Sequence, residues 1–167
     1  MELKQAIKQV KESKEFKDWN KKNPDIFFSY ALKMLENNNE QPWQLGFYHK
    51  STDRIVTFIV GEDAIEIQQE EDIFKKPTTD VKQVDIEKVK IPFNKLLEQT
   101  KKFQKTKYPK ELVNKTIAIL QNLEKYGTIW NITYVTHSFN TLNIKVNVEN
   151  GKIIHHSIES LMSFVKK

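Results

Sequence analysis

The sequence has no cysteine, only four glycines and a single arginine among its 167 residues. Without cysteine, the chain cannot form a disulfide, a thiolate metal site, an iron–sulfur cluster or a cysteine nucleophile. No P-loop, GxGxxG, GxSxG or HExxH pattern is present. No apolar run approaches the roughly 20 residues that a membrane helix needs. These absences predict a protein that is not an enzyme, holds no cofactor and is not inserted in a membrane.

The first residues, "MELKQAIKQVKESKEFKDW", have the pattern of an amphipathic helix and lack the apolar core of a secretory signal. We therefore expect a cytoplasmic location. A chain from which a leader had been removed would have the same appearance.

The positive charge of the chain comes almost entirely from lysine. Lysine and arginine together number 27 against 22 acidic residues, which gives a net charge of +5, and Arg54 is the single arginine. Arginine is the residue whose planar fork reads guanine and grips phosphate at two points. We therefore expect solvated lysine surfaces, and nucleic acid is a possible partner that we do not favour.

Ten phenylalanines, five tyrosines and three tryptophans predict a folded chain, and some of them fall in a repeated pattern. The stretches "QPWQLGFYHKSTDRIVTFIV" (41–60) and "GTIWNITYVTHSFNTLNIKVNV" (127–148) each indicate two strands joined by a turn. In both, a tryptophan begins the strand and bulky apolar residues follow at period 2: Trp43, Leu45 and Phe47, then Trp130, Ile132 and Tyr134. A third short apolar stretch follows each pair.

Two helices are expected before each group of strands. Helices beginning at Pro24 and Pro109 are predicted to end near 37–39 and at Gly127, and further helices span about 3–10 and 93–100. The fold class is therefore α+β, with two tandem α-α-β-β-β repeats, each with helices on one face of a three-stranded antiparallel sheet. We expect the repeats at 1–76 and 86–167 with a linker at 77–85, and a short helix in the tail after Ser157.

The stretch "TLNIKVNVENGKIIHH" (141–156) resembles the PepSY pattern of an alternating strand, a Gly-Lys turn and a returning apolar strand. The wider layout, a helix followed by a curled antiparallel sheet, is similar to PepSY-type and cystatin-like domains. The resemblance implies a non-catalytic module, of a kind that restrains or regulates a partner protein.

The strand predicted at 54–60 is apolar on both faces. Ile55 and Ile59 lie on one face and Val56, Phe58 and Val60 on the other. If the second set were exposed, the fold would lose several kcal/mol of hydrophobic stabilisation, at about 25 cal/mol per Å² of apolar area. The second repeat, the N-terminal helix, another subunit or a partner protein should therefore cover it. We take Val56, Phe58 and Val60 as candidate partner-binding residues.

An alternative function rests on the segment "KKFQKTKYPK" (101–110). Lysines interleaved with aromatic residues can hold single-stranded nucleic acid, and the candidates are Lys101, Lys102, Phe103, Lys105, Lys107, Tyr108 and Lys110. The same pattern also fits a helix junction whose aromatic side chains pack inward.

Histidine offers a weak metal candidate. His155 and His156 are adjacent on a predicted strand and so point to opposite faces, which lets only one of them join His137 in a shared site. We expect no metal. The sequence therefore predicts a protein-binding or self-associating module that acts through sheet faces and edges, with single-stranded nucleic-acid binding as the alternative.

Overall fold

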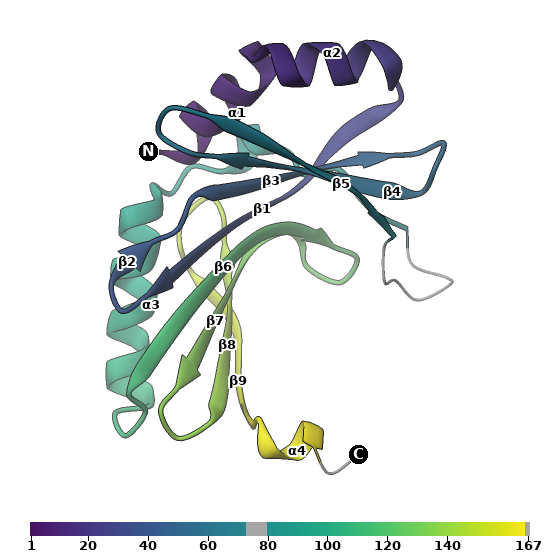
Figure 1. Cartoon of the computed structure of the whole chain (residues 1–167). Helices are drawn as coiled ribbons and strands as arrows, with labels where there is room; N and C mark the ends of the chain where they lie inside the picture. The colour runs from purple at the N-terminus through teal and green to yellow at the C-terminus, as the bar shows by residue number, and fades with distance from the viewer. Residues whose placement is uncertain (73–79, 166–167) are drawn as a thin grey trace.

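Nine strands form one antiparallel sheet (Figure 1). The first strand of each half of the chain lies at the centre of this sheet. The structure is a computed structural model and describes residues 1–72 and 80–165. The strand order is β5-β4-β3-β1-β6-β7-β8-β9, and β2 pairs with β1 beside this path. Each half of the chain thus runs outward from β1 or β6, which pair with each other at the centre.

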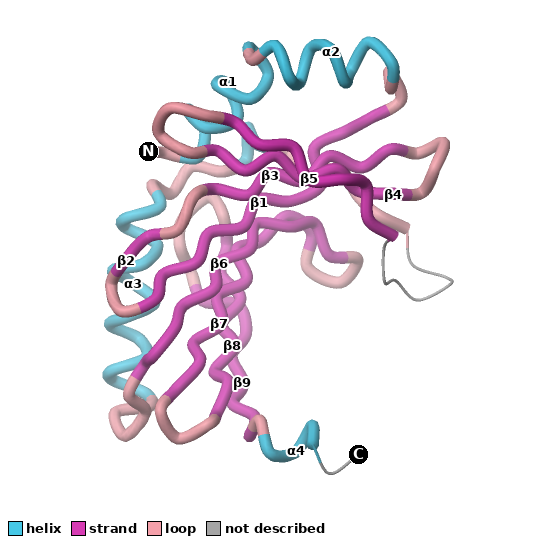
Figure 2. Tube along the Cα trace, viewed as in Figure 1, coloured by secondary structure: helices cyan, strands magenta, loops and turns pink. Residues whose placement is uncertain are grey.

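The strands are β1 (Ile26–Glu36), β2 (Asn39–Glu40), β3 (Trp43–His49), β4 (Arg54–Val60), β5 (Ile65–Asp72), β6 (Val113–Leu123), β7 (Gly127–Thr136), β8 (Asn140–Asn147) and β9 (Ile153–Ser160). The helices are α1 (Leu3–Glu12), α2 (Lys14–Lys22), α3 (Phe93–Lys107) and the short α4 (Met162–Val165), and a 3-10 turn, η1, spans Ile86–Lys88. Figure 2 shows α1 and α2 over one half of the sheet and α3 along the other.

One row of side chains shows how the core crosses the sheet. Directly paired residues on neighbouring strands share a face of the sheet, and six of them form an almost fully buried row: Phe58, Leu45, Ala31, Leu120, Trp130 and Val146. The row passes through both halves of the chain without a break. The two halves therefore share one hydrophobic core.

The long helices supply the other side of this core. On α2, Phe16 lies 5.4 Å from Phe58 between ring centroids. On α3, Phe93 lies 4.9 Å from Trp43 and 5.5 Å from Trp130. Helix α1 buries the apolar positions that its 3.6-residue period predicts: Leu3, Ala6, Ile7 and Val10.

The α+β class and the helices near 3–10 and 93–100 are confirmed, but the helices predicted from Pro24 and Pro109 are wrong. Those segments form β1 and β6. Both are central strands with buried residues on one face and half-buried apolar residues on the other, among them Leu32, Met34, Ile117 and Ile119. Periodicity cannot separate such near-continuous apolar sequences from helix. Asn37 and Asn38 form the β1–β2 turn, with φ of 50° and 63°, and Asn39 begins β2, so the three asparagines do not cap a helix.

The three-stranded sheets are also corrected, because each half contributes at least four strands to one common sheet. In the tail, β9 continues to Ser160, and the helix is confined to Met162–Val165. Residues 77–79 of the predicted linker lie outside the described residues. Further along it, the side chain of Val84 is buried and its N–H donates to the carbonyl of Phe28 at 3.0 Å.

Helices long and apolar enough to cross a membrane are absent from the described part of the chain.

Candidate functional site: a cleft beside an exposed aromatic turn

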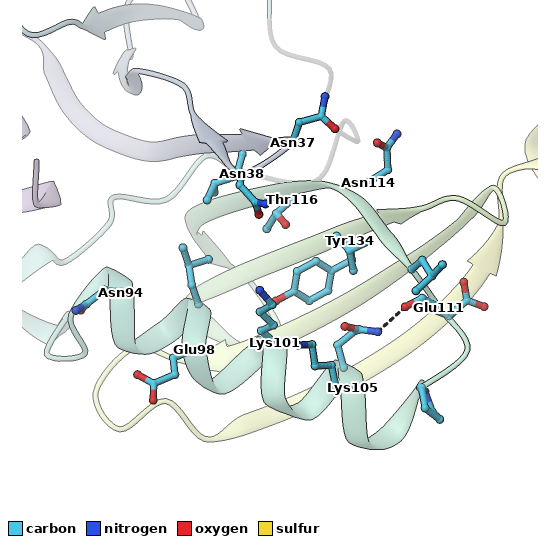
Figure 3. Close-up of a pocket in the computed structure, with 16 residues that line it drawn as sticks. Asn37, Asn38, Asn94, Glu98, Lys101, Lys105, Glu111, Asn114, Thr116 and Tyr134 are labelled. Atoms are coloured by element: carbon cyan, nitrogen blue, oxygen red, sulfur yellow. Dashed lines mark hydrogen bonds between the residues drawn. The ribbon is translucent and has the colours of Figure 1, made fainter.

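A cleft of about 710 Å³ lies between α3 and β6, and Figure 3 shows its walls. Helix α3 forms one wall, with Glu98, Lys101 and Lys105 along it. The loop after α3 and the start of β6 form the opposite wall, and the β1–β2 turn closes one end with Asn37 and Asn38. The volume is in the range of ligand-binding clefts.

Tyr134, on β7, lies at the floor of the cleft (Figure 3). Its hydroxyl donates to the Thr100 hydroxyl at 2.8 Å, and Thr100 in turn donates to the carbonyl of Leu96 at 3.0 Å. Burial raises the pKa of Tyr134 above its ordinary value near 10, because the charged phenolate would lose its hydration there. The residue is therefore a neutral hydrogen-bonding group at physiological pH and ties β7 to α3.

The loop after α3 is held in place by Gln104. This side chain is buried, and its amide donates to the carbonyls of Tyr108 and Glu111 at 3.1 and 2.7 Å. The carboxylate of Glu111 accepts a hydrogen bond from the side chain of Asn140 at 2.9 Å, while its second oxygen is buried without a hydrogen-bond partner. The cleft wall is thus bonded to the β7–β8 turn.

At this end of the cleft lies a set of exposed apolar side chains, which we name the Phe139 patch: Leu112, Phe139 and Met162. Their exposed fractions of 67%, 66% and 57% are the three largest among the large apolar side chains of the described residues. Hydrogen bonds bring their segments together, because His137 N donates to Leu112 O at 2.9 Å and Leu161 N donates to Phe139 O at 2.7 Å. Leu112 also lines the cleft.

Phe139 has a second unusual property. Its φ of 58° is left-handed, a conformation that costs an ordinary L-residue about 1–2 kcal/mol. The other non-glycine residues with positive φ in the described ranges are Asn37, Asn38 and Asp53, whose residue types tolerate this region. Phenylalanine is therefore unfavourable at this position both for the backbone and for its exposed ring.

The residues predicted for partner binding lie elsewhere. Val56, Phe58 and Val60 are exposed by 1%, 0% and 3% and are covered by the chain's own N-terminal helices. The prediction that they contact a partner is therefore not supported by the surface. Of the coverings that the sequence left open, the N-terminal helix is the one the structure provides.

The proposed nucleic-acid segment forms the second half of α3 and the loop after it. Its lysines are exposed (Lys101, Lys102, Lys105, Lys107 and Lys110). The aromatic rings pack inward: Phe103 lies 4.9 Å from the ring of His156, and the Tyr108 hydroxyl is 2.7 Å from Nδ1 of that histidine. The rings needed for base stacking are therefore engaged within the fold, as the alternative of an inward-packed junction predicted.

The histidines do not converge. His137 is exposed in the β7–β8 turn, whereas His155 and His156 lie on β9, with His156 against α3 and His155 near the ring of Tyr126. None of the four histidines lines the cleft. A search of the described residues finds no group of three metal-ligating side chains.

Sequence reasoning missed the Phe139 patch. Phe139 falls in the turn between the two strands predicted in 127–148, and an aromatic residue in the middle of that polar turn was the available signal. The helix predicted from Pro109 would have included Leu112, and that segment does not form a helix.

Comparisons with known proteins support the fold and leave the function open. No protein family and no curated protein matches the sequence. One solved structure is similar: a "putative lipoprotein" from Clostridium difficile 630, with a TM-score of 0.57 and 13% identity, over 87% of this chain and 90% of that one. At this identity, the likeness concerns the fold alone.

Proposed function

We propose that this protein is a non-catalytic protein-binding module whose partner contacts the Phe139 patch and reaches into the adjoining cleft. The observation that carries the proposal is Phe139 itself, an exposed aromatic ring on a left-handed turn residue. Large exposed apolar side chains on neighbouring segments, as here, are a common feature of protein interaction sites.

The free energy of the isolated chain does not favour this residue. Asparagine or glycine would relax the backbone, and a polar side chain would not expose an aromatic ring to water. A partner that covers the ring offsets both costs, since buried apolar area contributes about 25 cal/mol per Å². Aromatic anchors of this kind often contribute most of the binding energy of an interface.

The cleft extends the same contact surface. Its walls combine the apolar side chains of Leu97 and Val113 with asparagines and with Glu98, Lys101 and Lys105. Such a mixture suits a polypeptide segment, which presents apolar side chains, backbone amides and charges together.

Both halves of the chain are, in this proposal, copies of one ancestral PepSY-like or cystatin-like unit. Supporting this, a constant shift of 87 residues relates Trp43 to Trp130, Leu45 to Ile132 and Ala31 to Ala118. At the centre of the sheet, Ala31 pairs with Leu120 and Lys33 pairs with Ala118. The shift of 87 residues moves positions 31 and 33 to 118 and 120, so it converts one of these pairs into the other. A duplicated unit that pairs with its own copy would have this self-complementary register.

Site-specific photo-cross-linking tests the proposed interface. A photoreactive phenylalanine analogue placed at position 139 should give a discrete adduct with one partner in living host cells. Adduct recovered from the cytosolic fraction would also agree with the cytoplasmic location that we propose. Adding Leu112→Asn should abolish the adduct, because it removes the exposed apolar side chain of a neighbouring segment from the proposed interface without altering the turn.

The matched control is Thr52, in the β3–β4 turn, where the neighbouring Asp53 also has a positive φ. The same analogue at position 52 should give no such adduct. Equal cross-linking at 52 and 139, or an adduct that survives Leu112→Asn, would contradict the proposal.

A further inference from the structure

The α3 wall of the cleft presents two lysine side chains, Lys101 and Lys105. Both are exposed, and within the described ranges neither has an ion-pair partner. They are four residues apart on the helix, so their side chains leave the same face of it. The wall therefore carries two ammonium groups about one helical turn apart.

Glu98 and Glu111, the acidic residues that line the cleft, do not neutralise these lysines. Glu98 forms its ion pair with Lys95 at 3.1 Å, and Lys95 does not line the cleft. Glu111 accepts a hydrogen bond from Asn140, and its second carboxylate oxygen is buried. In Figure 3 both carboxylates lie apart from the two lysine side chains. The positive charge of the wall is therefore available to an anionic group from outside the chain.

The surroundings of this wall are basic as well. Residues 93–111 include six lysines and two glutamates, a net charge of +4. The rings of Phe103 and Tyr108 in the same stretch pack against His156, so they offer no platform on which a nucleobase could stack. An acidic polypeptide needs no such platform, and the wall therefore suits it better than a nucleic acid.

The spacing of the lysines fits an extended segment. Positions four residues apart on a helix are separated by about 6 Å along its axis, and alternate side chains of an extended chain are separated by about 6–7 Å. Acidic side chains at alternate positions can therefore meet Lys101 and Lys105 together. The side chains between them would face the apolar groups of Leu97 or Val113, and the exposed carboxamide of Asn114 can bond to the backbone of the segment.

We propose that the partner segment which enters the cleft is acidic and extended, with carboxylates at alternate positions that pair with Lys101 and Lys105. This inference rests on the proposed function, because it names the chemistry of the partner that contacts the Phe139 patch. Leu112 belongs to both the patch and the cleft lining, so one partner chain can occupy the two together. Complementary charge of this kind favours the right partner and speeds association.

A synthetic acidic peptide tests the chemistry of the cleft without the natural partner. The probe is a fluorescent peptide of about ten residues in which glutamate alternates with valine, long enough to span about 33 Å. Fluorescence anisotropy should show that the full chain binds it, with an affinity that falls as the salt concentration rises. Lys101→Glu combined with Lys105→Glu should weaken this binding by about tenfold or more, because two attractive charge pairs become repulsive.

Lys102→Glu combined with Lys107→Glu is the matched control. It makes the same change of charge at exposed lysines of α3 that do not line the cleft, and each pair includes one lysine of the last helical turn. The control pair should weaken binding by about threefold at most. The same peptide with glutamine in place of glutamate, and a single-stranded oligothymidylate of similar length, should both bind about tenfold more weakly than the acidic peptide.

An undetectable affinity of the wild-type chain for the acidic peptide would overturn the inference. So would an equal loss in the control pair, or equal binding of the glutamine peptide or the oligothymidylate. The adduct at position 139 is a separate readout, which Lys101→Glu with Lys105→Glu should reduce and the control pair should preserve. A normal wild-type adduct without peptide binding would contradict the acidic segment alone, whereas peptide binding without a wild-type adduct would contradict the proposed function alone.

Discussion

Trp43 and Trp130 share the core of the sheet but have different hydrogen-bonding environments. Trp43 and Trp130 are each 1% exposed, and their ring centroids are 6.3 Å apart in the shared core. The indole N–H of Trp43 donates to the carbonyl of Met1 at 2.9 Å, whereas that of Trp130 is buried without a partner. An unpaired buried donor costs about 1–3 kcal/mol.

Replacing each tryptophan by phenylalanine measures this difference. Both variants lose a similar ring volume, but Trp43→Phe also loses a hydrogen bond and Trp130→Phe removes an unpaired donor. We expect Trp130→Phe to retain a free energy of unfolding about 1–2 kcal/mol higher than Trp43→Phe, measured by urea denaturation. Equal losses, or a larger loss for Trp130→Phe, would show that the unpaired N–H has no energetic cost.

At the same scale, sequence patterns identify buried residues better than exposed ones. The period-2 pattern after each tryptophan predicted strand residues such as Leu45 and Ile132, and both are fully buried. The pattern around Phe58 predicted that something covers it, but it could not name α2 as the cover. Phe139 is unusual because of its backbone angle, which no sequence pattern reports.

Among the elements, the strands β1 and β6 were the hardest to predict. Both are 11 residues long, and side chains on both of their faces are at least partly covered. Apolar and polar residues alternate in the sequence of β8, because one face of that strand is polar. A strand with apolar residues on both faces lacks this alternation. The prolines before these segments favoured helix starts, and only long-range pairing between β1 and β6 decides otherwise.

One glycine permits the close fit of β1 and β3. Gly46 on β3 pairs with Tyr30 on β1, and the tyrosine ring lies over the glycine and reaches β4, where its hydroxyl is 2.8 Å from that of Thr57. A Cβ atom at position 46 would clash with the Tyr30 ring. Glycine in a strand commonly marks such a close approach.

Gly46→Ala should therefore lower the free energy of unfolding by about 1–3 kcal/mol, the usual cost of overpacking. Gly61→Ala is the matched control with a smaller expected loss, because its Cβ would meet one backbone oxygen at 3.2 Å. Chemical denaturation of both variants, and of Gly46→Ala combined with Tyr30→Ala, checks the cause. Losses that add without coupling in the double variant would exclude the clash with Tyr30.

For the whole molecule, the sequence predicted two units where the structure has one sheet. The strands that begin at the tryptophans could be predicted because their period-2 pattern depends on local sequence. The pairing of Ala31 with Leu120 and of Lys33 with Ala118 joins segments almost 90 residues apart, and no local pattern contains that information. The cleft and the Phe139 patch arise from the same long-range arrangement, which brings α3, β6 and the β7–β8 turn together.

We propose that Phe139 serves a contact outside the chain and not the stability of the chain. Phe139→Asn tests it most directly when thermal unfolding and partner cross-linking are measured on the same preparation, with the photoreactive group moved to position 112. We expect the melting temperature to rise by about 2–4 °C, as relief of about 1 kcal/mol of backbone strain would produce in a chain of this length, while the adduct disappears. A lower melting temperature, or an adduct that persists in the asparagine variant, would contradict it.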